Sequence, residues 1–126
     1  MKTILKNIVV VLAGIISGSI INMSLILLGA SIFPTSIDFS FIDAEMKYFI
    51  FPFLAHAIGT LSGAYICVKI SSDNQLAPPM IIGFYFLFGG INMSTILPAP
   101  IWFITLDLLV CYIPMAWLGW KLNIKK

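Results

Sequence analysis

The sequence predicts an all-α, polytopic membrane protein with four transmembrane helices, on the basis of its composition and its long apolar segments. Of the 126 residues, 60% are hydrophobic and 10% are charged, and the mean hydropathy is +1.07. Soluble domains carry about 25% charged residues, so this chain has too little polar surface for water. A helix needs roughly 20 mostly apolar residues to cross a bilayer, and four such segments fill the chain. We therefore expect residues 1–126 to form a single transmembrane domain with the lipid bilayer as its solvent.

The helices are expected at about residues 8–30, 48–70, 76–97 and 101–120, with an outer connection over residues 31–47. The first apolar segment follows two lysines, as a signal peptide does. It is longer than the 7–15-residue apolar core of a signal peptide, and no small-residue cleavage site closes it. We therefore expect this helix to be retained.

Prolines set the start of the last predicted helix and predict a kink within it. Pro98 and Pro100 separate it from the third helix, because neither residue can continue a helix. Pro114 lies inside the last helix, where it removes a backbone donor and leaves the carbonyl of Val110 without its usual partner. The sequence therefore predicts a kink near Pro114.

The lysines predict the orientation of the four helices. One side of the membrane would hold six of the seven basic residues: Lys2, Lys6, Lys69, Lys121, Lys125 and Lys126. The other side would hold only Lys47. Loops rich in lysine and arginine stay in the cytoplasm. Both termini are therefore expected to be cytoplasmic.

Small residues recur at helical spacing in three of the four segments. Gly14 and Gly18 share a face of the first helix, Gly59 and Gly63 share a face of the second, and Gly89 lies on a polar face of the third. Glycines four residues apart let another helix backbone approach closely. We expect these five glycines to mark contacts between helices.

Each helix also carries one strongly polar side chain, namely Asn22, His56, Asn92 or Asp107. At 1.5 Å per residue, all four lie roughly 8–12 Å from the outer ends of their helices. A charged aspartate at the centre of a membrane helix costs about 2.5–3.5 kcal/mol on insertion scales, so Asp107 should face inward. His56 is its expected partner, either as an ion pair or with both groups neutral, and the two asparagines are expected to donate hydrogen bonds to this pair.

This polar layer has more than one interpretation. Interhelical hydrogen bonds can simply fix which helix faces which. Alternatively, the layer handles a proton, an ion or a small ligand, as intramembrane ionisable residues commonly do. In a third interpretation, the layer is completed only across an oligomer interface. No metal or cofactor is expected, because no second carboxylate lies at this depth and Cys67 and Cys111 lack metal-binding or redox spacing.

An internal repeat is also predicted. Ile21-Asn22-Met23-Ser24 in the first helix recurs as Ile91-Asn92-Met93-Ser94 in the third. A two-helix tandem repeat would make His56 and Asp107 counterparts, with the two halves related by an axis along the membrane normal.

Several segments of the later part of the chain match a known pattern: Gly89-Gly90-Ile91-Asn92, Leu97-Pro98-Ala99-Pro100-Ile101-Trp102-Phe103, Asp107 and Pro114. A weaker match is His56-Ala57-x-Gly59-x-x-x-Gly63. With these segments, about the C-terminal two thirds of the chain resembles a family of small, uncharacterised bacterial four-helix inner-membrane proteins. This resemblance implies four spans and a bacterial inner-membrane location, and it implies no activity.

Two functions therefore remain in view. The first is an oligomeric transport protein, or a protein that binds an ion or small ligand, with the polar layer as its site. The alternative is a non-catalytic accessory or assembly subunit of a larger membrane complex. An enzyme with catalytic residues is not expected, since Ser24 lies about 200° around its helix from Asn22 and cannot join the layer. Nucleic acid is not an expected partner, because no basic run with interleaved aromatic residues occurs.

Overall fold

The computed structural model describes residues 2–35, 39–71 and 73–124. Within this part of the chain, the predicted all-α fold with four membrane-length helical segments is confirmed, because α1, α2, α3 and the α4–α5 pair are each long and apolar enough to cross a membrane. The helices are α1 (Lys2–Ile32), α2 (Lys47–Ser71), α3 (Ala77–Ile96), α4 (Ile101–Val110) and α5 (Ile113–Leu122).

The first helix differs most from its predicted bounds, since it begins at Lys2 instead of residue 8. Its backbone hydrogen bonds are local, and lysine is a good helix former. The change in polarity after Lys6 therefore marks where the apolar segment begins, and the helix itself starts earlier. α2 and α3 lie within one residue of the predicted 48–70 and 76–97. Residues 36–38 of the predicted outer connection lie outside the described residues.

The last predicted helix, residues 101–120, is divided in two. α4 ends at Val110, and α5 begins at Ile113 with Pro114 in its first turn. Between them, Cys111 and Tyr112 form a turn. Proline has no N–H to donate to the carbonyl four residues earlier, and its ring clashes with that carbonyl. The chain therefore changes direction in the turn of helix before Pro114.

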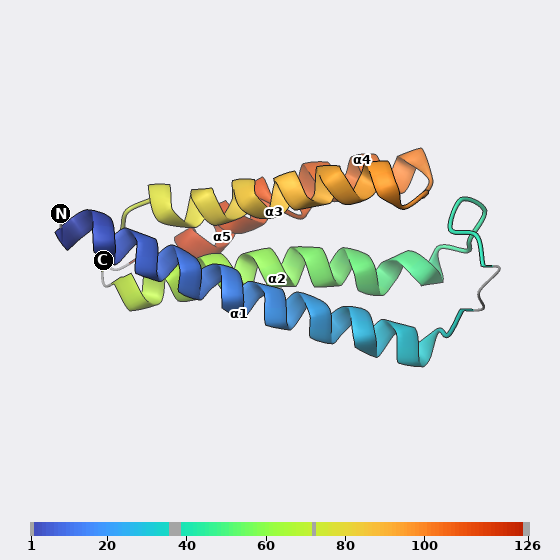
Figure 1. Cartoon of the computed structure of the whole chain (residues 1–126), viewed down its shortest axis with the longest axis horizontal. Coiled ribbons are helices and arrows are strands. Elements are labelled where there is room, and N and C mark those ends of the chain that lie inside the picture. Colours follow the sequence, from blue (N-terminus) through green and yellow to red (C-terminus); the bar gives the residue numbers. More distant parts are fainter. Residues whose placement is uncertain (1, 36–38, 72, 125–126) are drawn as a thin grey trace.

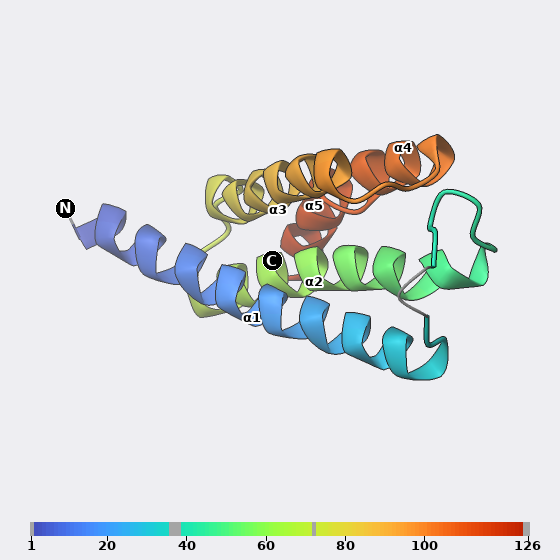
Figure 2. The same ribbon diagram turned by 45° about the vertical axis from the view of Figure 1, so that its right-hand side comes forward.

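The helices form two layers (Figure 1). α1 and α2 run side by side in one layer, and α3 and α4 lie side by side in the other. Both views show the start of α1 near one end of the bundle and the described residues of the 33–46 connection, 33–35 and 39–46, at the opposite end (Figures 1 and 2). α2 is the central helix, because it packs against each of the other four. Five of its residues are at most 1% exposed: Ala55, Thr60, Ala64, Cys67 and Val68.

Four glycines bring α1 and α2 into backbone contact. A Cβ atom added at Gly63 would lie 2.6 Å from the carbonyl oxygen of Gly14, and one added at Gly18 would lie 2.6 Å from that of Gly59. No side chain larger than hydrogen fits at such distances without a shift of backbone. The crossing of α1 and α2 is therefore as close as the spacing of these glycines indicates.

Gly89 is an exception to the predicted packing. A Cβ atom added there would meet nothing within 4 Å, and the residue is exposed. Its face of α3 points into a gap, because α1 contacts α3 near Gly18 and Phe86 and the two helices then diverge (Figure 2). Gly89 therefore does not mark a contact between helices of this chain.

Polar contacts join the helices at the end of the bundle where α1 begins. The ammonium group of Lys6 donates a hydrogen bond to Asp73 in the α2–α3 connection, which holds the pKa of this carboxyl below its usual range. From α5, Trp120 Nε1 donates to the carbonyl of Asn74 at 3.0 Å. The α2–α3 connection thus ties α1 and α5 together at this end.

A glycine in close helix contact, Gly63, and a glycine beside open space, Gly89, lead to opposite stability predictions. Gly63→Ala should lower the free energy of unfolding by about 1–3 kcal/mol, the usual cost of overpacking, because its methyl group meets the backbone of Gly14. The matched change Gly89→Ala should raise it by up to about 1 kcal/mol, since alanine is the better helix former. Unfolding in mixed detergent micelles measures both. Equal effects of the two substitutions would contradict the described α1–α2 contact.

Candidate functional site

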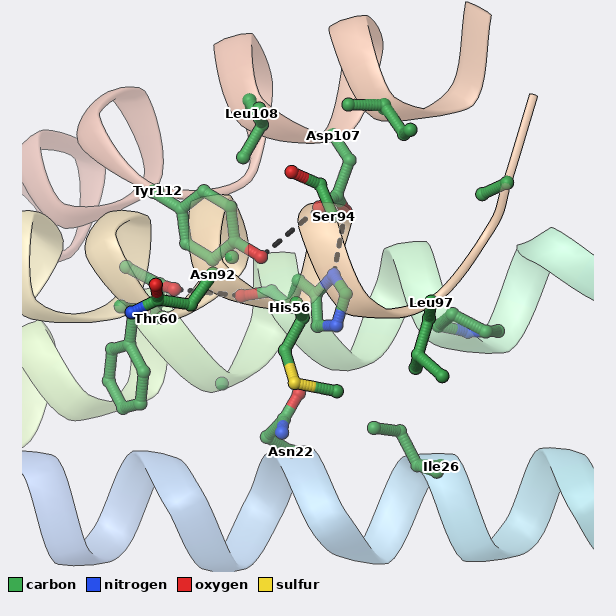
Figure 3. Close-up of a pocket in the computed structure, with 18 of the residues that line it drawn as sticks. Asn22, Ile26, His56, Thr60, Asn92, Ser94, Leu97, Asp107, Leu108 and Tyr112 are labelled. Atoms are coloured by element: carbon green, nitrogen blue, oxygen red, sulfur yellow. Dashed lines mark hydrogen bonds and ion pairs between the residues drawn. The ribbon is translucent and has the colours of Figure 1, made fainter. Parts of the chain in front are cut away.

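The buried carboxylate of Asp107 is the centre of the candidate site. Asp107 lies on α4 and is only 5% exposed. Its Oδ1 lies 2.7 Å from Nδ1 of His56 on α2, and its Oδ2 accepts a hydrogen bond of 3.1 Å from the hydroxyl of Tyr112 (Figure 3). A buried charge is tolerated only when it is paired and hydrogen-bonded. His56, the partner predicted for Asp107, and Tyr112 together meet this requirement.

Tyr112 is a member of the site that the sequence reasoning missed. It follows Asp107 by five residues, which on a regular helix places it about 140° away. The break at Cys111 and Tyr112 brings the phenol back toward the carboxylate. Gly90 on α3 leaves room for it, because a Cβ atom there would lie 2.6 Å from the Tyr112 hydroxyl oxygen. The signal in the sequence was Pro114, since a helix break just before this proline alters the side-chain directions.

His56 has one ring nitrogen engaged and one directed elsewhere. The Tyr112 hydroxyl donates to one oxygen of Asp107, and when Asp107 is ionised its other oxygen accepts the Nδ1–H of His56 at 2.7 Å. The second nitrogen, Nε2, points away from the carboxylate (Figure 3), and 25% of the side chain is accessible. The ring also stacks on that of Tyr112, with 5.8 Å between centroids. Nε2 therefore offers a lone pair when His56 is neutral and a second N–H when it is protonated.

A cavity of about 730 Å³ lies beside this group. Its volume is within the range of roughly 300–1,000 Å³ that is typical of small-molecule sites. All four residues of the predicted polar layer line it: Asn22 from α1, His56 from α2, Asn92 from α3 and Asp107 from α4. The polar faces of the four segments thus converge within one chain. Seven aromatic residues also line the cavity: Phe41, Phe49, Tyr85, Phe86, Phe88, Phe103 and Tyr112.

The cavity opens sideways between α1 and α3. Met23 of α1 and Tyr85 and Phe88 of α3 line it, yet each is more than half exposed at the outer surface of the bundle. This exposure fits the divergence of the two helices toward the 33–46 connection (Figure 2). If the apolar surface of the bundle is covered by lipid, the opening faces the bilayer.

The two asparagines do not donate the predicted hydrogen bonds to the His56–Asp107 pair. Among the described residues, the buried Oδ1 atom of Asn22 has no hydrogen-bond partner, and Asn92 is exposed. Asn22 projects into the cavity from α1, opposite His56 (Figure 3), so the cavity separates it from the carboxylate. An unpaired buried polar atom costs about 1–3 kcal/mol.

The cysteines and the metal-binding side chains add little to the site. Cys67 and Cys111 are buried and free, and the thiol of Cys111 donates to the carbonyl of Phe53 at 3.5 Å. In the part of the chain that the structure describes, no group of three or more His, Cys, Asp or Glu residues is placed to hold a metal ion.

Comparisons of the chain with protein-family models, with curated proteins and with solved structures found no match. The resemblance to small bacterial four-helix inner-membrane proteins, which was drawn from the residues alone, stays a prediction. The tandem repeat also stays a prediction. Any function must therefore be argued from the geometry of the site.

The contact between His56 and Asp107 predicts the tautomer of the imidazole. Since His56 is the only histidine, ¹⁵N NMR of histidine-labelled protein reports this one ring. Neutral His56 should carry its proton on Nδ1, held there by the carboxylate. Asp107→Asn should greatly lower the Nδ1–H population, because an amide can donate to Nδ1 instead. Asp43→Asn makes the same chemical change in the exposed connection and should leave the spectrum as it is. An unaltered tautomer in Asp107→Asn would contradict the described pair.

Proposed function

We propose that this protein binds a small ligand within the membrane and that this binding serves its transport. The observation that carries the proposal is the cavity of about 730 Å³, where the His56–Asp107 pair meets a largely aromatic and aliphatic wall. Binding sites of this kind combine an apolar lining with a few polar groups that orient the ligand.

The alternative, in which the polar layer only holds helices together, accounts for less of the geometry. Polar side chains that join helices are satisfied by one another. Here Nε2 of His56 points away from its protein partner, and the amide oxygen of Asn22 is buried without a partner among the described residues. Both residues line the cavity, and 25% of the His56 side chain is accessible. The free Nε2 of His56 therefore favours a ligand that contacts this ring.

The proposed activity is binding and not catalysis. The phenolic hydroxyl of Tyr112 donates to Asp107, and two aliphatic hydroxyl groups also line the cavity close to the pair. That of Thr60 donates to the carbonyl of His56 at 2.8 Å, and that of Ser94 donates to the carbonyl of Ile91 at 2.7 Å. A nucleophile must instead be hydrogen-bonded to its base. Both hydroxyls are therefore held in structural bonds to the backbone.

We further propose that both termini are cytoplasmic and that the membrane is the inner membrane of a bacterium. Among the described residues, the end of the bundle where α1 starts carries four lysines: Lys2, Lys6, Lys69 and Lys121. Lys47 lies at the other end, and Lys125 and Lys126 fall outside the described residues. The positive-inside rule then supports an outward position for the 33–46 connection. The cavity would lie in the outer half of the bilayer.

The ligand-binding proposal predicts that a thiol on the cavity wall reacts with a small uncharged reagent that can enter from water or from the bilayer. Asn92→Cys should be modified much faster than Ile91→Cys, because Asn92 lines the cavity that holds the His56–Asp107 pair and its neighbour Ile91 does not, and a thiol in hydrocarbon does not form the reactive thiolate. The measurement uses N-ethylmaleimide and protein in lipid nanodiscs. The unmodified protein gives the background, since Cys67 and Cys111 are buried. Equal rates at positions 91 and 92 would contradict an open cavity.

An accessory subunit is the second candidate, and the lateral opening is the observation that favours it. A helix of a partner protein could cover the gap between α1 and α3, where Gly89 is exposed. Native mass spectrometry of tagged protein, extracted from its own membranes in mild detergent, separates the two candidates. A homo-oligomer is expected for the ligand-binding protein. A larger partner at fixed stoichiometry would favour the subunit and contradict the first candidate.

A further inference from the structure

We infer that the ligand is an apolar organic cation, such as a phosphonium or quaternary ammonium ion, and that it competes with a proton for the negative charge of the site. This inference rests on the proposed function, because it names the chemical class that the cavity binds.

The first step is the charge of the described residues that line the cavity. α4 contributes the carboxylate of Asp107, and α2 contributes the imidazole of His56. Two phenols, of Tyr85 on α3 and Tyr112 after α4, complete the titratable groups. α1 contributes none, and none of the lining residues is lysine or arginine. Phenols are ordinarily neutral near pH 7. With Asp107 ionised and His56 neutral, the site carries one negative charge, which a single proton on the His56–Asp107 pair balances.

The second step is the energetic cost of leaving that charge unbalanced. A net charge inside a bilayer is costly, so charged groups there are paired. With His56 protonated, the His56–Asp107 pair is neutral. With His56 neutral, a positive ligand restores neutrality, whereas an anion would place a second negative charge beside Asp107. The site thus favours one positive charge, carried either by His56 or by the ligand.

The third step is the kind of cation. Metal ions such as Ca²⁺ require six or more oxygen ligands, and the lining offers few oxygens that are not already bonded. Aromatic rings are abundant instead, with residues from α2, α3 and α4 and from the 33–46 connection. Ring faces attract cations within about 6 Å of their centroids, most strongly when water is excluded. An apolar organic cation, which is weakly hydrated, fits this lining best.

The fourth step is access. The mouth between α1 and α3 is bordered by Met23, Tyr85 and Phe88, so it admits a molecule that dissolves in the bilayer.

Three probes of one shape test the sign of the charge. Tetraphenylphosphonium, tetraphenylborate and tetraphenylsilane carry charges of +1, −1 and 0. Equilibrium binding to the full chain in nanodiscs, with empty nanodiscs subtracted, should be saturable for tetraphenylphosphonium alone. Its affinity should rise with pH, because the cation and the proton compete for the single negative charge of the His56–Asp107 pair. Exchange of one cation for one proton limits this rise to about tenfold per pH unit.

Two variants complete the test. Asp107→Asn should abolish both saturable binding of tetraphenylphosphonium and its pH dependence, whereas Asp43→Asn should retain them. Size-exclusion chromatography checks that each variant is folded, and the comparison of the three probes in the unmodified protein stands even if Asp107→Asn does not fold.

The outcomes that overturn the inference also differ from those that overturn the proposed function. Binding of tetraphenylborate or tetraphenylsilane as tight as that of tetraphenylphosphonium would overturn the cation class and leave ligand binding in place. Saturable binding of none of the probes would also overturn the inference. In that case the reactivity of the cysteine introduced by Asn92→Cys decides separately whether the cavity is open. Binding of tetraphenylphosphonium that does not change with pH would overturn the competition with a proton.

Discussion

The structure depends on the contacts that compensate the buried carboxylate of Asp107 inside an apolar helix bundle. Asp107 receives a contact from His56 on α2 and a hydrogen bond from Tyr112, on the far side of a helix break. Its burial therefore links three elements, and removing one partner would leave a buried charge without compensation, which costs several kcal/mol. The turn at Cys111 and Tyr112 and the absence of a side chain at Gly90 both make this arrangement possible.

Close packing and the cavity come from different parts of the same helices. The glycines of α1 and α2 let their backbones touch, and side chains of Lys6, Asp73 and Trp120 join the elements near one end. Farther along, α1 and α3 separate and the cavity opens. The bundle is therefore close-packed toward the end where α1 begins, and it is hollow between α1 and α3 toward the other end.

Much of this fold follows from the sequence, because lipid permits few structures. Four apolar segments of spanning length predict four helices, and the depths of His56 and Asp107 along their helices predict that they meet. Tyr112 was missed because side-chain directions were inferred from an unbroken helical period. Gly89 was misjudged because spacing identifies the face of a helix but not whether a neighbour reaches it. For the same reason, Asn22 and Asn92 could be assigned to the layer, whereas their distance from Asp107 could not be predicted.

The division of the last span also has a mechanical consequence. It makes the segment from Ile101 to Leu122 two short helices joined at Cys111 and Tyr112. α5 packs closely on α2, since a Cβ atom at Gly119 would lie 2.6 Å from the carbonyl oxygen of Leu61. α4 packs less extensively against the other helices than α5 does, and it carries Asp107 near its end. A change in the tilt of α4 can thus alter the width of the cavity while α5 stays packed on α2. The hydrogen bond from Tyr112 to Asp107 links the two short helices across the turn.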